Sequence, residues 1–485
     1  MGMITVFRKL PRLFWVSNTI ELFERWAWYG FYMAFALYLV GSKDTGALGF
    51  SQLQKGLIIG TGSALLYFLP LLTGAIADRL GYKKILLLSF AMYLSGYYMI
   101  GTFKSFELVF FAFIWTAVGG AFFKPIISAM VARTTDSSTA SIGFGLFYMM
   151  VNIGGFIGPF IAGIILNKSW SYVFYMSIMT IGINVVLTLL FFKDPIRKRS
   201  AESIWETILQ IFKNIGSTLA DYKYVLFLLI ISLFWTAFNQ LYYSFPIFVD
   251  HWVDTSVVYR SIASISPWLA SAIGTSEGTI SAVTISSMDS FFIILFQLII
   301  STIVMKYRPL SVMIAGMLIV AGGVGMMFSF TNGWIIILGI LVFGIGEMSS
   351  SPKITEYIGR IAPRDKKALY MGTSYLPIAL GHTLAGYLSG APYEHVADKF
   401  YLIRKEVVAQ GIHLPELSDK FTKNDLFNQA AAQMHMTPGQ LSAFLWDKYH
   451  PSSVWIIYSG IAIGAMILLW LYDRFILKGQ NAYEI

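Results

Sequence analysis

Apolar runs long enough to cross a membrane recur from one end of this 485-residue chain to the other, and they constrain the fold more than any other feature. A helix of about 20 residues spans a hydrocarbon core of about 30 Å. Because no water is available there, each segment must satisfy its own backbone hydrogen bonds, which favours helices. The sequence therefore predicts an all-α membrane protein. The twelve expected spans lie near residues 13–40, 54–77, 85–103, 107–131, 142–166, 172–192, 224–249, 280–305, 310–330, 333–358, 367–390 and 453–474.

The composition excludes several other classes of protein. Hydrophobic residues make up 56% of the chain and charged residues 13%, whereas soluble domains carry roughly 25% charge. The absence of cysteine excludes disulfides and thiolate metal sites. We find no nucleophile–base set, phosphate-binding loop or metal-ligand spacing, so we expect neither an enzyme nor a bound cofactor. The net charge of +9 does not indicate a nucleic-acid partner, because the basic residues lie in short connections between apolar runs.

The basic residues also predict the orientation in the bilayer. Cytoplasmic loops are enriched in Lys and Arg, and in this chain the enrichment falls on alternate connections. An even number of spans then places both termini in the cytoplasm of a multi-pass protein, which we expect in the plasma membrane (the bacterial inner membrane). The residues behind this prediction are Arg8, Lys9, Arg12, Arg79, Lys83, Lys84, Lys193, Arg197, Lys198, Arg199, Lys306, Arg308, Arg360, Arg364, Lys366, Lys367, Arg474 and Lys478.

Three polar segments interrupt the spans. Residues 193–223 form a basic cytoplasmic linker that divides six spans in 1–192 from six in 224–485. Residues 250–279 and 391–452 are expected to be external insertions, the second with short helices. One such helix should start at Thr437, because Pro438 then occupies the first turn, where helices tolerate it. A solvated cap is the simpler interpretation of both insertions, and a surface for a specific partner is the alternative.

Residues 74–84, GAIADRLGYKK, connect spans two and three. They resemble the cytoplasmic signature of the major facilitator superfamily, in which a tight turn, here at Gly81, follows an Asp–Arg pair. The resemblance implies two six-helix bundles with a substrate site between them near the middle of the membrane. Asp78 and Arg79 are then candidates for a cytoplasmic gate.

Span one carries three charged residues inside the membrane, where each is costly and must face protein or water. Glu21, Glu24 and Arg25 share one helical face about 100° wide with Trp28 and Tyr32. Two acids beside one arginine leave an acid in excess, which suits a proton carrier. The alternative is an ion pair within the helix that only fixes its packing.

Span four supplies a possible counter-charge, Lys124. At about 1.5 Å per residue, Lys124 lies about 14 Å from Arg133 and Glu21 about 14 Å from Arg12, and both arginines mark the cytoplasmic edge. The lysine and the acid therefore share one depth. Lys124 is either an anchor for a substrate carboxylate or the partner of the span-one acids, and we expect it to do both in turn.

Several stretches together resemble the proton-dependent oligopeptide transporters of this superfamily. In the first half these are ELFERWAWYG, FFKPIIS and FYMMVNIGGFIGP, in spans one, four and five. In the second half FWTAFNQ, GEMSSSP and YLPIALGHTLAG follow the family pattern in order and spacing, but less closely. The resemblance implies proton-driven uptake of di- and tripeptides, with no cofactor beyond the coupling proton.

The resemblance also implies roles for particular residues. Glu21, Glu24 and Arg25 would couple protons. The residues assigned to the peptide are Arg25, Tyr29 and Lys124 for its carboxylate, Tyr67 and Asn152 for its backbone, and Glu347 for its amino group.

The second half departs from the family pattern. Asn239 stands where the family usually has an acid, and Tyr32 stands where it has the arginine that pairs with that acid. Asp289 replaces an asparagine, Tyr375 belongs to an altered aromatic pair, and His382 replaces another asparagine. These changes predict a divergent member whose second half recognises something different, so Asn239, Asp289 and Tyr375 are added to the candidate substrate contacts.

Asp289 and Glu347 are predicted to form a pocket for a substrate amine. Neither of their spans contains an arginine, and the nearest cation in sequence, Lys353, can pair with Glu356 three residues away. Trp235 is a further candidate for the cavity wall, although packing is the common role of an aromatic residue in so aromatic a chain.

The sequence thus predicts a proton-coupled symporter that imports short peptides or peptide-like solutes as a monomer. A transporter of the same architecture that imports or exports another amphiphile (a drug, siderophore or lipid) is the main alternative. A sensor that no longer transports is the other.

Overall fold

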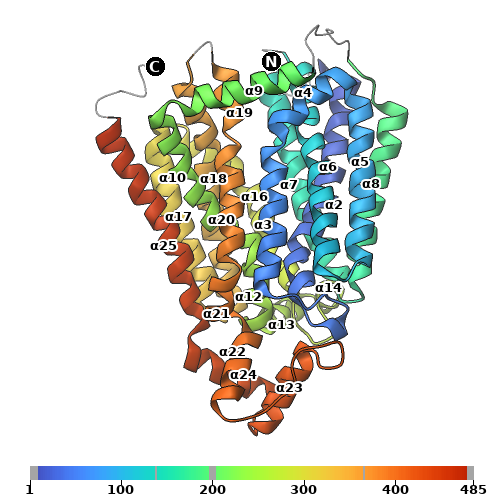
Figure 1. Ribbon diagram of the computed structural model, residues 1–485, viewed down its shortest axis with the longest axis vertical. Helices are drawn as coiled ribbons and strands as arrows, with labels where there is room; N and C mark the ends of the chain where they lie inside the picture. The colour runs from blue at the N-terminus through green and yellow to red at the C-terminus, as the bar shows by residue number, and fades with distance from the viewer. Residues whose placement is uncertain (1–8, 137–138, 196–203, 364–365, 478–485) are drawn as a thin grey trace.

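The chain is a bundle of long helices standing side by side, with a smaller group of short helices at one end (Figure 1). The computed structural model describes residues 9–136, 139–195, 204–363 and 366–477. Of the basic residues used to predict orientation, Arg8, Arg197, Lys198, Arg199, Arg364 and Lys478 lie outside this part. The helices of the first half are α2 (Arg12–Val40), α3 (Gln52–Phe68), α4 (Pro70–Leu80), α5 (Tyr82–Thr102), α6 (Phe106–Arg133), α7 (Ala140–Ile165) and α8 (Trp170–Phe191).

The second half has the same plan with more interruptions. Its long or paired helices are α10 (Tyr222–Phe238), α11 (Gln240–Tyr243), α12 (Phe245–Trp252), α15 (Ala282–Ser286), α16 (Met288–Val304), α17 (Pro309–Ser329), α18 (Gly333–Ile361), α19 (Lys367–Thr373), α20 (Leu376–Leu388) and α25 (Val454–Leu471), which continues as a π-helical turn, Tyr472–Ile476. Several predicted spans are thus broken near their middle, as at Asn239 and Ser244 in the seventh span.

Proline explains the sharpest of these breaks. The second span bends by 50° between α3 and α4, where Pro70 is the first residue of α4. Because proline has no backbone N–H and its ring collides with the preceding turn, it removes a helical hydrogen bond and bends the chain. Pro246 and Pro377 likewise stand in the first turn of α12 and α20.

Among the described residues, nine helices are long and apolar enough to cross a membrane, and the bent pair α3–α4 makes a tenth. Two predicted spans fall outside that group. One is α2, which carries Glu21, Glu24 and Arg25; the other is divided into α19 and α20. The predicted fold class, an all-α membrane protein, is confirmed.

The helices of each half pack mainly on one another. In the first half α2 lies against α7 and α8, and α5 against α6; in the second, α17 lies against α18 and α25, and α10 against α20. The two halves meet chiefly where α3 crosses α20 and where α7 meets α15 and α16. A site between the halves is therefore walled by helices far apart in the sequence.

The crossing of α3 and α20 is very close. A Cβ atom at Gly56 would lie 2.2 Å from the backbone oxygen of Gly386, so no larger residue fits. Beside it, the fully buried Lys55 donates hydrogen bonds to the backbone oxygens of Tyr243 (2.9 Å) and Ser389 (2.8 Å). These contacts join the halves at the end that carries the short helices.

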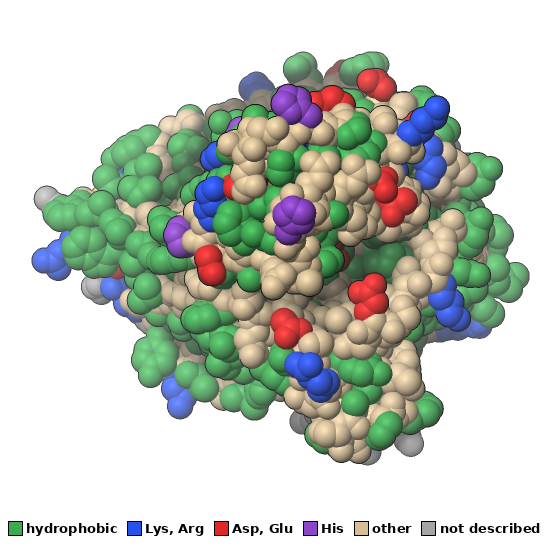
Figure 2. Space-filling view, turned by 90° about the horizontal axis from the view of Figure 1, so that it is seen from below, with side chains coloured by type: hydrophobic (Ala, Val, Ile, Leu, Met, Phe, Trp, Pro, Cys, Tyr) green, Lys and Arg blue, Asp and Glu red, His purple; other side chains and the backbone are tan. Residues whose placement is uncertain are grey.

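Those short helices belong to residues 391–452, which we call the external segment. They are α21 (Ala391–Ala397), α22 (Lys399–Ala409), α23 (Lys423–Gln433) and α24 (Pro438–Tyr449). The predicted start at Thr437 is confirmed, since Thr437 caps α24 with Pro438 in its first turn. The other insertion, 250–279, contains α13 (Ser256–Ile265) and α14 (Pro267–Ile273). Figure 2 shows this end, with acidic, basic and histidine side chains intermingled.

The external segment is attached to the first half by buried polar contacts. Lys423 Nζ donates to the backbone oxygens of Val40 (2.7 Å) and Phe50 (3.1 Å), and Gln52 Nε2 donates to Asp398 Oδ2 (2.6 Å). Burial alone would raise the pKa of Asp398, but His251, Lys423 and Gln52 together hold that pKa below its usual value. An ionised Asp398 therefore favours the attached arrangement.

The opposite end carries the start of α2, the end of α25 and the linker helix α9 (Ile204–Leu219), which lies across it (Figure 1). Helix α9 contacts α4 of the first half and α19 of the second, and Arg79 donates to Thr207 in it at 3.1 Å. Asp78 lies 3.7 Å from Arg133 of α6 and accepts a hydrogen bond from Tyr82. The predicted gate residues therefore contact α6 and the linker.

Candidate functional site

The charged residues of span one form one buried cluster on α2. Arg25 Nε lies 3.1 Å from Glu21 Oε1, and Arg25 Nη2 lies 2.5 Å from Glu24 Oε2. Tyr93 of α5 donates a further hydrogen bond to Glu24. All three charged residues are at most 5% exposed. The prediction that two carboxylates share one arginine is confirmed.

Lys124 of α6 adds a second cation to this region. Its Nζ lies 3.5 Å from the centre of the Tyr67 ring, where the negative face of the ring attracts a cation. Glu21 and Glu24 act on it electrostatically, yet no carboxylate of the described residues lies within 4.0 Å of Nζ. The lysine is therefore close to the acids without being held by a direct ion pair.

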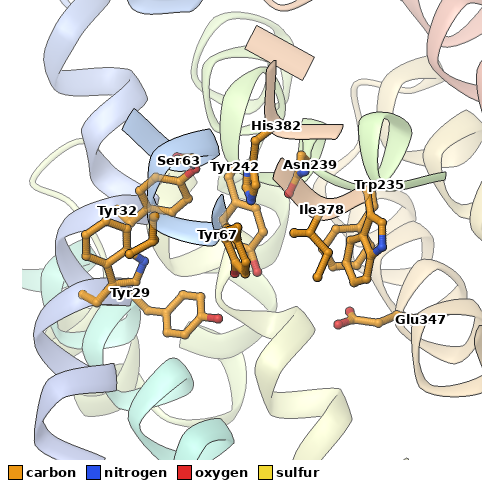
Figure 3. Close-up of a pocket in the computed structure, with 13 residues that line it drawn as sticks. Tyr29, Tyr32, Ser63, Tyr67, Trp235, Asn239, Tyr242, Glu347, Ile378 and His382 are labelled. Carbon is orange, nitrogen blue, oxygen red and sulfur yellow. Dashed lines mark hydrogen bonds between the residues drawn. The ribbon is translucent and has the colours of Figure 1, made fainter. Parts of the chain in front are cut away.

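A cavity of about 150 Å³ lies beside this cluster, between the two halves. Figure 3 shows Tyr29, Tyr32 and Ser63 on one side and Trp235, Asn239 and Glu347 on the other, with Tyr67 and Tyr242 between them. Arg25 contacts it through the Tyr29 ring, whose centre lies 5.7 Å from the guanidinium carbon. The lining residues are Trp28, Tyr29, Tyr32, Ser63, Leu66, Tyr67, Trp235, Phe238, Asn239, Tyr242, Glu347, Ile378 and His382.

Two hydrogen-bond donors of the second-half wall are unused. Neither Trp235 Nε1 nor Asn239 Nδ2 has a partner among the described residues, although both atoms are buried. A buried donor without an acceptor costs free energy, so an acceptor placed beside these two groups would be favoured. A peptide carbonyl is an acceptor of the required kind.

Two buried acids lie at the second-half side of the cavity. Glu347 of α18 lines the cavity, and Asp289 of α16, which is 3% exposed and outside the lining, acts on the Glu347 carboxyl group. A Cβ atom at Gly344 would lie only 3.2 Å from Asp289 Oδ1, so glycine gives Asp289 its place against α18. Lys353 lies 2.8 Å from Glu356, as predicted, and is thereby occupied.

Of the other predicted substrate contacts, two are not part of the cavity wall. Asn152 Nδ2 donates to the backbone oxygen of Tyr148 at 2.8 Å, one turn away in α7. Tyr375, at the start of α20, is 37% exposed. Both lie outside the lining set, so the structure brings together Tyr29, Tyr67, Trp235, Asn239 and Glu347 but not these two.

Some lining residues were not among the predicted site residues. Ser63 accepts or donates a hydrogen bond with the Tyr32 hydroxyl at 2.8 Å, and its spacing of four residues from Tyr67 places both on one helical face. That spacing could have identified it. His382 stacks on Tyr67 at 4.9 Å and contacts the Tyr243 hydroxyl at 3.0 Å. Nothing local in the sequence brings Tyr243 and His382 together.

The chain matches the family model described as Major Facilitator Superfamily over residues 19–259 and 253–397. This protein belongs to the major facilitator superfamily. The chain is similar to a dipeptide and tripeptide permease B of Xenorhabdus bovienii, with 32% identity over 181 residues, or 36% of each chain. The chain thus spans about a third of the length of the permeases that it matches at this identity.

Weaker likenesses cover a larger share of the chain. The peptide transporter YePEPT of Yersinia enterocolitica is 23% identical over 460 residues, covering 76% of this chain and 86% of the relative. A POT family transporter solved with 5-aminolevulinic acid superposes with a TM-score of 0.70 at 18% identity, covering 96% of this chain and 97% of the other. The predicted resemblance to the proton-dependent oligopeptide transporters is confirmed.

Proposed function

We propose that this superfamily member is a proton-coupled symporter that imports di- and tripeptides or similar solutes by alternating access. The observation that carries the proposal is the charge arrangement around the central cavity. Arg25 and Lys124 lie behind the first-half wall, whereas Glu347 lines the second-half wall and Asp289 lies next to it, outside the lining. A solute with a carboxylate at one end and an ammonium at the other matches this arrangement.

The unused donors support a peptide over a simple amino acid. Trp235 Nε1 and Asn239 Nδ2 lie on the Glu347 side of the cavity and have no acceptor among the described residues, and the carbonyl of a peptide bond is an acceptor of the kind they require. Glu21 and Glu24 are the proposed proton carriers, because they compete for Arg25 and one of them can be released when a substrate carboxylate or a proton arrives. Proton and substrate would thereby act on one cluster.

The closed crossing of α3 and α20 supports a direction of access. The two halves are in contact at the end of the bundle that carries the external segment, through Gly56, Lys55 and Gly386. In this conformation the cavity would therefore exchange solute at the opposite end of the bundle. The basic loops favour the cytoplasm for that end. We propose plasma-membrane insertion with both termini cytoplasmic, and a monomer as the transporting unit.

Uptake into proteoliposomes tests the proposal. Purified protein should concentrate a labelled dipeptide when the outside is acidic, and a proton ionophore should abolish the accumulation. Free amino acids of the same composition should not compete at equal concentration. Accumulation that does not change with the imposed pH gradient would contradict proton coupling. A lack of dipeptide uptake under every gradient would contradict the proposed substrate.

The aromatic wall of the cavity favours a second candidate function, transport of an apolar amphiphile. Seven of the lining residues are aromatic: Trp28, Tyr29, Tyr32, Tyr67, Trp235, Phe238 and Tyr242. Such a wall also suits an apolar amphiphile. Because a ligand that binds only the folded state raises its stability, a thermal-shift screen of peptides against amphiphiles distinguishes the two. A larger stabilisation by uncharged amphiphiles would favour the second candidate.

A further inference from the structure

Asp289 and Glu347 differ from the other buried acids in the described part of the protein because no cation accompanies them. Asp289 and Glu347 act on each other electrostatically, and no Lys, Arg or His of the described residues is among the groups that act on either carboxyl. Lys353, on the same helix as Glu347, lies 2.8 Å from Glu356 instead. Two buried negative charges without compensation are strongly unfavourable.

The contact between the two carboxyl groups requires a proton. An ionised carboxylate has no hydrogen to donate, so two ionised carboxylates cannot hydrogen-bond to each other. Asp289 Oδ1 lies against Gly344, one turn before Glu347 on α18, and the two carboxyl groups are within hydrogen-bonding reach of each other. Asp289 Oδ1 and Glu347 Oε2 are both buried, and neither accepts a hydrogen bond from any described donor.

The groups around the pair are neutral. The phenols that face it come from three helices: Tyr29 of α2, Tyr148 of α7 and Tyr242 of α11. His382 of α20 lines the same cavity, but its ring contacts Tyr67 and the Tyr243 hydroxyl. A proton or a cationic ligand is therefore what can balance the pair.

We infer that Asp289 and Glu347 share one proton while the cavity is empty, and that the ammonium group of the substrate displaces this proton when it binds. The inference rests on the proposed function and specifies how its second half recognises an amine. The charge balances: a pair that holds one proton carries a net charge of −1, and two carboxylates around one ammonium also carry −1. The displaced proton leaves to solvent through the open cavity.

Such an exchange affects the coupling of transport. The second half gives up a proton as the substrate enters, while the first half takes one up to drive the cycle. When the protein binds a substrate with a free amine, it would therefore take up one net proton fewer than when it binds the same substrate with a blocked amine. The number of protons taken up with each substrate thus depends on whether its amino terminus is free.

Calorimetric titration of the full-length protein with a dipeptide tests the exchange. Titrations in two buffers of different ionisation enthalpy give the number of protons released. At about pH 6 the peptide amine is already protonated in solution, so it does not contribute. The wild type should release about one proton more than Asp289→Asn, in which Glu347 is a single acid that binds the amine without a proton to displace. Glu277→Gln, which changes an exposed acid of the 250–279 insertion, is the control and should give the wild-type number.

Infrared spectroscopy gives a second measurement that does not depend on affinity. The empty wild type should show the carbonyl absorption of a buried protonated carboxylic acid, which Asp289→Asn removes and which added dipeptide diminishes. Equal proton numbers in the wild type and Asp289→Asn, with the dipeptide bound to both, would overturn this inference and leave the proposed function standing. A wild type that binds no dipeptide would overturn both.

Discussion

The two halves of the cavity differ in how the charges of their buried acids are compensated. In the first half Glu21 and Glu24 lie beside Arg25 on one helix, with Lys124 on a neighbouring helix, so two acids face two bases. In the second half Asp289 and Glu347 come from two helices and no described base acts on them. The first half is therefore balanced without a ligand, whereas the second half needs a proton or a cation.

Because of this difference, the two halves are proposed to have different tasks, proton coupling in the first and recognition of the amine in the second. A balanced cluster can exchange partners when a proton or a carboxylate arrives, because each acid that is released finds another cation nearby. An unbalanced pair favours any cation that enters. Coupling should therefore fail when the first half is changed, and selectivity for the amine should fail when the second half is changed.

The largest effect is expected at the acids of the first half. Glu21→Gln or Glu24→Gln should abolish concentrative uptake under an imposed pH gradient, because the exchangeable proton is lost. Counterflow without a gradient should continue, since the cavity remains. The measurement is uptake of labelled dipeptide into proteoliposomes, with Glu277→Gln, an exposed external acid, as the control. Concentration of substrate by both variants would show that the proton is carried elsewhere.

The next effect is expected at Lys124. Lys124→Ala should weaken binding of peptides with a free carboxylate roughly tenfold to a hundredfold, because charge-assisted hydrogen bonds contribute about 1.5 to 3 kcal/mol. Peptides with an amidated carboxyl terminus should lose much less. Binding can be measured by competition against a labelled dipeptide. Equal losses for both ligands would leave Lys124 as a structural partner of the acids and would remove the proposed division between the halves.

A smaller effect is expected at the contact between Glu347 and the substrate amine, which can be removed from the protein, from the peptide or from both. Glu347→Gln and N-acetylation of the peptide should each weaken binding roughly tenfold, since both remove one charge-assisted contact. Their combination should add little, because they remove the same contact. The four affinities form a double cycle. Fully additive losses would show that Glu347 does not hold the amine.

The smallest effect is expected at Lys353. Lys353→Met should change dipeptide affinity by less than about twofold, because Glu356 already holds this lysine and does not line the cavity. Arg360 lies 2.5 Å from Glu356 and would keep it paired. A tenfold gain in affinity for amines would mean that Lys353 reaches Glu347 in solution, and the second half would no longer be unbalanced.

Much of this protein could be predicted from its sequence because the information is local. Apolar length fixes the spans, since a segment in lipid must satisfy its own backbone. The cluster of Glu21, Glu24 and Arg25 follows from spacing along one helix. The cap at Thr437 and the pairing of Lys353 with Glu356 are also local, and both are found as predicted.

Only the tertiary structure decided which helices face one another across the cavity. Asn152 belonged to the expected motif, yet its side chain bonds within α7, and Tyr375 lies outside the lining set. The contact of Asp289 with Glu347 depends on the packing of α16 against α18 at Gly344. The attachment of the external segment through Lys423 joins residues more than 370 positions apart. Sequence spacing fixes which side chains share a helical face, but the neighbour of that face is chosen by shape and burial across the whole fold, so these contacts had no local signal.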